Sequence, residues 1–396
     1  MKVKLYRNLA DAVINTLQII FEENRYADKV IEKTLKQNPK WGARDRRFIA
    51  ETTYDIVRWF RFLKKVSGAD DHDYWRLLGA WLIWKKIEIP DWGPFNDLST
   101  KTISENLLKE YPLPIQESIP DWLHDLGSQE LPLRWSNEIK SLNQEASVVL
   151  RVNTLKADKN TIRQQLQEEG IETIPDPKFT SALLLAKRMN VFGSKAFKSG
   201  LFEVQDAGSQ LIAPFLRAEP GMRVIDACAG AGGKTLHLAS LMENKGRIVA
   251  MDTEAWKLEE LKKRARRAGA NNIETKVIEN SKSIKRLANS ADRLLLDVPC
   301  SGLGVLKRNP DAKWKLSMDY ILKVKELQQK ILSEYSIMIK PGGMLVYSTC
   351  SILPSENEKQ VHQFLNSNEG FELVDEKHSW PSEGFDGFYM ALLRKK

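Results

Sequence analysis

Cysteine and histidine, the residues of disulfide frameworks and zinc sites, are scarce in this sequence. Its 396 residues include five histidines and three cysteines, Cys228, Cys300 and Cys350. The cysteines form no Cys-x-x-Cys pair and the histidines are scattered, so no metal site is expected. The odd, sparse cysteine count also excludes a disulfide framework and favours a reducing compartment.

Long apolar runs and an excess of acidic charge are lacking as well. No run approaches the roughly 20 apolar residues that span a bilayer, and no apolar signal segment follows the start of the chain. We therefore expect a cytoplasmic protein without a membrane partner. The chain has 60 Lys and Arg against 52 Asp and Glu, a net charge of +8. This excess fits either nucleic acid as a partner or an ordinary solvated basic surface.

Three regions of the sequence differ in their pattern. In residues 1–140 apolar side chains recur at helical spacing, as at Leu9, Val13 and Leu17, which predicts a helical domain. Residues 146–200 indicate a small α/β module. From 201 to 396, strands alternate with helices, which predicts a Rossmann-like α/β domain with a mostly parallel, doubly wound sheet. Its strands are expected at 223–227, 247–252, 275–278, 293–297, 343–348 and 388–393.

The first of these strands leads into a glycine-rich loop, which reads Asp-Ala-Cys-Ala-Gly-Ala-Gly-Gly-Lys-Thr over residues 226–235. Glycines allow a close ligand, and the helix that follows presents free N–H groups. Three ligand classes remain open. A P-loop nucleotide site would need glycine where Cys228 stands, and a dinucleotide site would need it at Thr235. S-adenosylmethionine fits the loop with Asp252 for the ribose, but a dinucleotide would also fit Asp252.

Two cysteines follow neighbouring predicted strands. One strand ends in Asp297-Val-Pro-Cys300 and the next in Ser348-Thr-Cys350. Ligands of an open parallel sheet bind beyond the carboxyl ends of its strands, so both thiols and Asp297 should converge on one pocket. A thiolate that adds to C6 of cytosine activates C5 toward a sulfonium methyl group, and Lys234 is a candidate cation to favour that thiolate. The alternative interpretation is that both cysteines are small, buried apolar residues, which is what free cysteines usually are.

With these residues the sequence resembles the Sun/Fmu (RsmB-like) family of RNA cytosine-C5 methyltransferases. The resemblance rests on the glycine loop and on residues 297–314, 340–351 and 386–390. Shorter similar segments are 150–155, 205–210, 45–50 and 54–58. The resemblance implies a NusB-like RNA-binding domain at 1–140, an RRM-like module at 146–200 and a class I methyltransferase domain at 201–396. A P-loop hydrolase and a non-catalytic RNA-binding factor are the competing functions.

The resemblance also implies roles for individual residues. Cys350 would attack C6, Cys300 would assist breakdown of the adduct, and Asp297 would contact the base. The residues implied for S-adenosylmethionine binding are Cys228, Ala229, Gly230, Ala231, Gly232, Gly233, Lys234, Asp252, Asn280 and Asp297. Two positions depart from the family pattern, because Ala231 replaces a usual proline and Asn280 a usual aspartate. The implied partner is RNA, small-subunit ribosomal RNA first and transfer RNA as the alternative, bound by a monomer.

Overall fold

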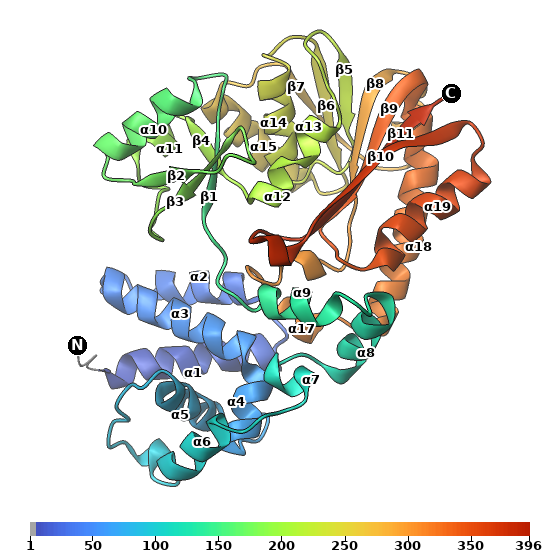
Figure 1. Cartoon of the computed structure of the whole chain (residues 1–396). Helices are drawn as coiled ribbons and strands as arrows, with labels where there is room; N and C mark the ends of the chain where they lie inside the picture. The colour runs from blue at the N-terminus through green and yellow to red at the C-terminus, as the bar shows by residue number, and fades with distance from the viewer. Residues whose placement is uncertain (1–4) are drawn as a thin grey trace. The chain divides into compact units, whose positions relative to one another are not determined.

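The computed structural model describes residues 5–396 and divides the chain into two compact units. Residues 1–4 of the expected helical domain lie outside the described residues. The first unit is helical and contains the chain up to Gln144 together with Leu306–Leu316. Its helices, shown in Figure 1, are α1 (Arg7–Glu22), α2 (Ala27–Gln37), α3 (Ala43–Arg58), α4 (Phe60–Ser67), α5 (Tyr74–Trp84), η1 (Gly93–Phe95), α6 (Thr100–Leu107), α7 (Leu113–Gln116), α8 (Asp121–Glu130), α9 (Trp135–Leu142) and α17 (Ala312–Lys315).

The core of the helical unit follows the apolar spacing of its sequence. Leu9, Val13 and Leu17 are buried along one face of α1, because side chains three or four positions apart share a helix face. Helix α5 differs in being buried along most of its length, from Tyr74 to Leu82. It is therefore the central helix of this core, and its tryptophan Trp81 packs there.

The helical unit includes a segment that belongs, in sequence, to the expected catalytic domain. Leu306–Leu316 follows the loop that carries Cys300 and is bound to α3 by hydrogen bonds. The buried Arg58 guanidinium donates to the Lys307 carbonyl at 2.8 Å, and Lys313 Nζ donates to the Arg58 carbonyl at 2.8 Å. Trp314 Nε1 donates to the Val57 carbonyl at 2.7 Å. The contiguous ranges 1–140, 146–200 and 201–396 do not describe this insertion.

The second unit begins at Glu145 and contains two sheets. The smaller sheet is antiparallel, with strand order β2-β3-β1-β4. Its elements are β1 (Val149–Val152), α10 (Lys159–Glu168), β2 (Thr173–Pro175), β3 (Ala182–Leu185), α11 (Lys195–Lys198) and β4 (Phe202–Val204). Because β4 pairs with β1, this sheet continues past residue 200.

The larger sheet has seven strands in the order β10-β11-β9-β8-β5-β6-β7. The strands are β5 (Arg223–Asp226), β6 (Arg247–Asp252), β7 (Ile273–Val277), β8 (Ala291–Asp297), β9 (Ile339–Thr349), β10 (Phe371–Ser379) and β11 (Phe388–Lys395). From β7 to β9 neighbours are parallel, whereas β11 and β10 are antiparallel. This confirms the predicted mostly parallel sheet. Strand β10 was not expected, because this edge strand exposes most of its side chains and lacks a regular apolar alternation.

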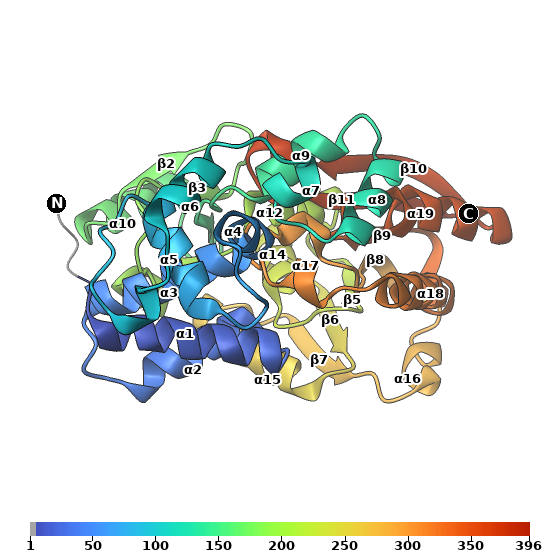
Figure 2. The ribbon, with the colours of Figure 1, turned by 90° about the horizontal axis from the view of Figure 1, so that it is seen from below.

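Helices cover both faces of the larger sheet (Figure 1). The helical segments of this part of the chain are α12 (Ala207–Gln210), α13 (Ile212–Phe215), α14 (Gly233–Leu241), α15 (Ala255–Ala268), α16 (Ser281–Lys285), η2 (Leu303–Val305), α18 (Met318–Tyr335), η3 (Ser336–Met338), η4 (Pro354–Glu356), α19 (Glu358–Ser367) and η5 (Pro381–Glu383). Neighbouring strand residues face opposite ways. Val224 therefore packs with α13, α14 and α15, and Ile225 with α16, α18 and α19. Figure 2 shows α18 and α19 side by side.

No helix within residues 5–396 is both long enough and apolar enough to cross a membrane.

Candidate active site

The glycine loop joins β5 to α14 and approaches the end of β6. Its tight turn needs glycine at position 232, where φ is +87° and a Cβ atom would lie 2.5 Å from Leu261 Cγ. The Gly230 N–H donates to Asp252 Oδ2 at 2.9 Å. The Thr235 hydroxyl donates to Asp226 Oδ2 at 2.7 Å. These bonds hold the ends of two neighbouring parallel strands close to the backbone of the loop.

An ion pair connects the glycine loop to the end of β8. Lys234, in the first turn of α14, lies with its Nζ 2.6 Å from Asp297 Oδ2. The Ser348 hydroxyl, near the end of β9, donates to Asp297 Oδ1 at 2.9 Å. Burial by itself would lower the pKa of Lys234, but Asp297 and, to a smaller extent, the charge of Cys350 raise that pKa above its usual value. Lys234 is therefore held as a cation beside both groups.

The thiols of Cys300 and Cys350 lie together at the same edge of the sheet. Their sulfur atoms are 3.3 Å apart, and both cysteines are free. The hydrogen bond to Cys350, then burial, then the charges of Cys350 and Glu356 raise the pKa of Cys300 well above its usual value. The Cys300 thiol is therefore kept protonated.

The backbone after each cysteine is closely packed against the other. The Gly304 N–H donates to the Cys350 carbonyl at 2.9 Å. A Cβ atom at Gly304 would lie 2.8 Å from that carbonyl and 2.1 Å from the Gly387 carbonyl. Only glycine allows this approach of three backbone segments.

A cavity of about 220 Å³ lies between the glycine loop and the end of β8. Its lining residues are Val204, Gln205, Ser209, Asp226, Cys228, Ala229, Gly233, Lys234, Arg264 and Asp297. Burial raises the pKa of Asp226 to about 7, and its Oδ1 has no hydrogen-bond partner among the described residues. An unpaired buried oxygen in a cavity is a place for a polar ligand atom. These residues fit a nucleoside cofactor that carries an amino acid.

The predicted cofactor residues fall into three groups. Cys228, Ala229, Gly233, Lys234 and Asp297 line this cavity. Gly230, Ala231, Gly232 and Asp252 belong to the loop or contact it. Asn280 instead stands at the start of α16, exposed, with its side chain accepting from the Lys282 N–H at 2.9 Å. It is not among the residues that line the cavity, so its contact with adenine stays a prediction.

Sequence reasoning missed the residues that support the glycine loop from the smaller sheet. Arg151 of β1 is buried, and its guanidinium donates to the Gly233 carbonyl and to Gln205. Burial lowers its pKa to about 9. Arg264 of α15 donates to the Ala231 carbonyl at 2.7 Å and to Glu203 of β4 at 3.0 Å. The segments 150–155 and 205–210 resemble the family, but nothing in their sequence assigns them to the cofactor pocket.

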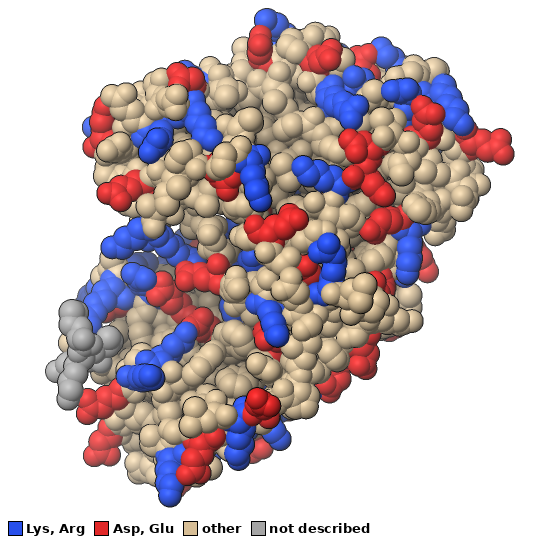
Figure 3. Space-filling view, in the orientation of Figure 1, with Lys and Arg blue, Asp and Glu red and all other residues tan. Residues whose placement is uncertain are grey.

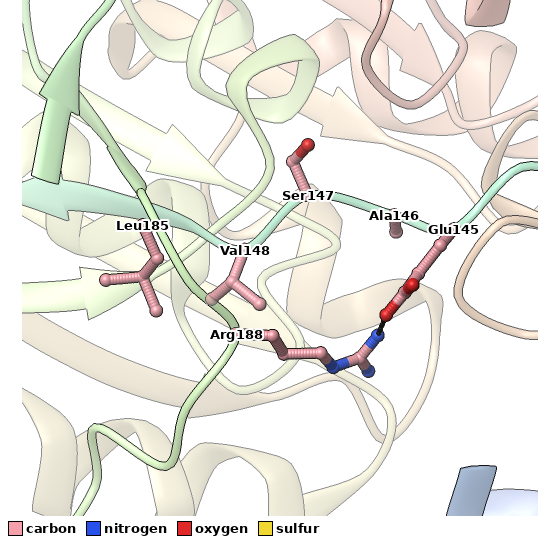
Figure 4. A pocket seen from close by; sticks show the side chains of 6 residues that line it. All are labelled: Glu145, Ala146, Ser147, Val148, Leu185 and Arg188. Atoms are coloured by element: carbon pink, nitrogen blue, oxygen red, sulfur yellow. Dashed lines mark hydrogen bonds and ion pairs between the residues drawn. The ribbon is translucent and has the colours of Figure 1, made fainter. Parts of the chain in front are cut away.

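A second cavity of about 230 Å³ lies beside the segment that precedes β1 in the sequence (Figure 4). Its lining residues are Glu145, Ala146, Ser147, Val148, Leu185 and Arg188. Arg188 Nη1 donates to Glu145 Oε1 at 2.7 Å, so its two charged groups pair with each other. None of the predicted site residues lines it. Within the described part of the chain, no group of three or more His, Cys, Asp or Glu side chains is arranged to hold a metal ion.

Comparison with known proteins gives consistent matches. Residues 213–394 match the family described as 16S rRNA methyltransferase RsmB/F. Residues 119–192 match the ferredoxin-like domain described as RsmF/B-like. The probable ribosomal RNA small subunit methyltransferase B of Synechocystis sp. is 32% identical, over 93% of this chain and 90% of that protein. The ribosomal RNA small subunit methyltransferase B of Vibrio cholerae is 34% identical, over 70% of this chain and 65% of that protein.

Two solved structures extend the likeness to the fold. The crystal structure of PH0851 superposes with a TM-score of 0.84 at 25% identity, covering 100% of both chains. A methyltransferase homologue from Pyrococcus horikoshii gives 0.64 at 28% identity, covering 72% of this chain and 97% of that one.

The parallel sheet, its glycine loop and the carboxylate beyond the next strand define a Rossmann-like methyltransferase whose cofactor is S-adenosylmethionine. The comparisons narrow that class. The chain belongs to the Sun/Fmu (RsmB-like) family.

Proposed function

We propose that this protein transfers a methyl group from S-adenosylmethionine to C5 of a cytosine in small-subunit ribosomal RNA, through a covalent bond between Cys350 and C6. The observation that carries the proposal is the pair of sulfur atoms, 3.3 Å apart, beside the Lys234–Asp297 ion pair. A cytosine-C5 transfer needs a nucleophilic sulfur and a group that holds the base. The edge of this sheet supplies both next to the cofactor cavity.

The cofactor, when bound, supplies an electrophilic sulfonium methyl group. The glycine loop and the cavity walls would hold it, with Asp252 taking the ribose hydroxyls. The unpaired Oδ1 of Asp226 would accept a hydrogen bond from its polar end. Arg151 and Arg264 bind the carbonyls of Gly233 and Ala231, and so fix the loop that would hold the cofactor.

Cys350 starts the reaction as a thiolate. It adds to C6 of the cytosine, so that a sulfur–carbon bond forms and the electrons of the C5–C6 double bond move onto C5. Lys234 is the cation that would stabilise this thiolate, because the charge of Cys350 is among those that act on Lys234. Asp297, fixed by Lys234 and Ser348, would contact the N3 and N4 side of the base.

Cys300 takes part when the adduct breaks down. After C5 has gained the methyl group, its proton passes to water, the double bond re-forms, and the C6–sulfur bond breaks with the electrons going to Cys350. Cys300 is kept protonated and its sulfur lies 3.3 Å from that of Cys350. It can therefore donate a hydrogen bond to the departing thiolate, which stabilises the leaving group.

Ribosomal RNA is proposed as the substrate because the relatives named above carry that substrate in their names. Charge adds little to the choice. Figure 3 shows basic and acidic side chains interspersed over the face that it displays. A cytosine stacked in a helix has to leave the stack before a thiol can add to its C6, so the target base must be unpaired or flipped out.

The test is to map 5-methylcytosine after incubation with a labelled methyl donor. The parent protein should label C5 of a cytosine in small-subunit ribosomal RNA. Cys350→Ala should lower incorporation by roughly 10⁴-fold or more, because it removes the nucleophile. S-adenosylhomocysteine should still raise the unfolding temperature of that variant, as for the parent. Label in transfer RNA alone, label at another atom, or full activity in Cys350→Ala would each contradict the proposal.

A further inference from the structure

A carboxylate with no exposed surface lies behind the two cysteine loops. Glu356, in η4 after β9, is 0% exposed. Its Oε1 accepts from the Ser301 N–H at 2.8 Å and from Gln328 Nε2 at 3.1 Å. Its Oε2 accepts from the Ser301 hydroxyl at 2.5 Å and from the Ser351 hydroxyl. Both oxygens are thus satisfied by two donors each, as a buried charge requires.

These donors share one property, which is their place next to the sulfur atoms. Ser301 directly follows Cys300, and Ser351 directly follows Cys350. Gln328 of α18 also donates to the carbonyl of Pro299, the residue before Cys300, at 2.9 Å. One carboxylate therefore binds both loops, in each case at the residue that directly follows the cysteine. The two loops come from different strands, 50 residues apart.

We propose that Glu356 is a positioning residue that holds the Cys300 and Cys350 loops together. This inference rests on the proposed function and names a residue that acts on its chemistry through both thiols. Glu356 is not among the residues that line the cofactor cavity. Its effect should therefore fall on the thiols and on turnover, and leave the affinity for the cofactor unchanged.

The charge of Glu356 has a second effect, on Cys300. It is one of the causes that raise the pKa of that thiol, after the hydrogen bond to Cys350 and burial. A neutral side chain at this position would remove that contribution. Glu356→Gln also replaces one acceptor oxygen by an NH₂ group, which cannot accept from the serine hydroxyls or the Ser301 N–H. The change keeps the volume and alters the hydrogen bonding and charge.

The first measurement reports on geometry and needs neither RNA nor methyl transfer. The full-length protein is equilibrated with glutathione and glutathione disulfide. The Cys300 and Cys350 thiols lose two electrons and two protons to form a disulfide, while glutathione disulfide is reduced to two glutathione thiols. Glu356→Gln should lower the equilibrium constant for this disulfide by about 10-fold, since loosened loops bring the sulfur atoms together less often.

The second set of measurements separates positioning from a general structural role. Turnover by Glu356→Gln should fall roughly 10- to 100-fold, as small displacements of reacting groups do, while S-adenosylhomocysteine affinity stays within about 2-fold. Alkylation of Cys300 by iodoacetamide, followed on its peptide, should begin at lower pH than in the parent. The matched control is Glu358→Gln, the same change two residues on, where the side chain pairs with His378 at 2.7 Å. It should behave as the parent.

The outcomes decide the matter in each direction. A parent-like disulfide equilibrium together with parent-like turnover in Glu356→Gln would overturn the proposal. Loss of S-adenosylhomocysteine binding along with both readouts would show a structural role instead, and would overturn it too. If Glu356→Gln does not fold, Ser351→Ala removes a single donor, and an unchanged disulfide equilibrium there overturns the proposal. Failure of cytosine methylation with a shifted disulfide equilibrium would count against the proposed function alone.

Discussion

Cys300 and Cys350 follow neighbouring strands and nearly touch, yet the groups that act on the two thiols differ. The loop after β9 places Cys350 beside the Lys234 cation, whose pKa the charge of Cys350 helps to raise. The loop after β8 places Cys300 where the hydrogen bond to Cys350, then burial, then the charges of Cys350 and Glu356 raise the pKa of its thiol. Burial and a nearby anion both favour the protonated form of a thiol. The proposed division of roles between two identical side chains therefore rests on their different surroundings.

Strand order explains how the sheet creates this difference. β8 lies between β5 and β9, so its carboxyl end faces the glycine loop on one side and the end of β9 on the other. Asp297, which ends β8, bonds to Lys234 of the loop and to Ser348 of β9. Only two residues separate Asp297 from Cys300. The comparison of the two cysteine loops can be tested by removing each thiol and each neighbouring charge. The last variant removes Arg151, which supports the glycine loop and contacts neither cysteine loop.

After Cys350→Ala, the largest effect is expected from Cys300→Ala, measured with substrate RNA on a denaturing gel. If Cys300 assists release, this variant forms the Cys350–C6 bond but breaks it slowly, so a covalent protein–RNA band should accumulate and turnover should fall about 10²- to 10⁴-fold. The double variant Cys300→Ala/Cys350→Ala should show no band, because it lacks the nucleophile. A band that persists in the double variant, or none in the single one, would break the assignment of roles.

The convergence of these residues could be predicted from the sequence because it follows from a sheet rule. Asp252, Asp297, Cys300 and Cys350 each stand at or just beyond the end of a predicted strand, and the carboxyl ends of parallel strands share one edge. Strand positions alone therefore placed them together with the glycine loop. The raised pKa of the Cys300 thiol was not predictable, because the hydrogen bond to Cys350, the burial and the charges of Cys350 and Glu356 that cause it depend on how the two loops pack.

Other features escaped prediction because they depend on packing between distant segments. Arg151 lies 82 residues before the Gly233 carbonyl that it supports, in a sheet of its own. Lys313 is buried in the helical unit although it belongs in sequence to the catalytic half. Lysine side chains are almost never fully buried, so a lysine in the sequence normally indicates a solvated surface. Neither its local pattern nor its charge signals a hydrogen bond to the Arg58 carbonyl.

A smaller effect is expected from Lys234→Met, which removes the cation beside Cys350. The charge of Cys350 is among the causes that raise the pKa of Lys234, after Asp297, and a cation near a sulfur nucleophile favours its reactive form. Turnover at neutral pH should therefore fall roughly 10-fold in Lys234→Met. Lys245→Met, an exposed lysine paired with Glu243, is the control. Unchanged turnover in Lys234→Met would mean that Lys234 does not activate Cys350.

The smallest effect on the thiols is expected from Arg151→Met, because Arg151 contacts neither cysteine loop among the bonds described. Its guanidinium holds the Gly233 carbonyl and Gln205, and a lost hydrogen bond from a charged donor corresponds to roughly 10- to 100-fold in affinity. Calorimetry with S-adenosylhomocysteine should show that loss, while the pH dependence of turnover at saturating cofactor stays that of the parent. Arg163→Met, exposed on α10 of the same small module, should change neither. A shifted pH profile in Arg151→Met would show that the glycine loop and the two cysteine loops respond as one unit.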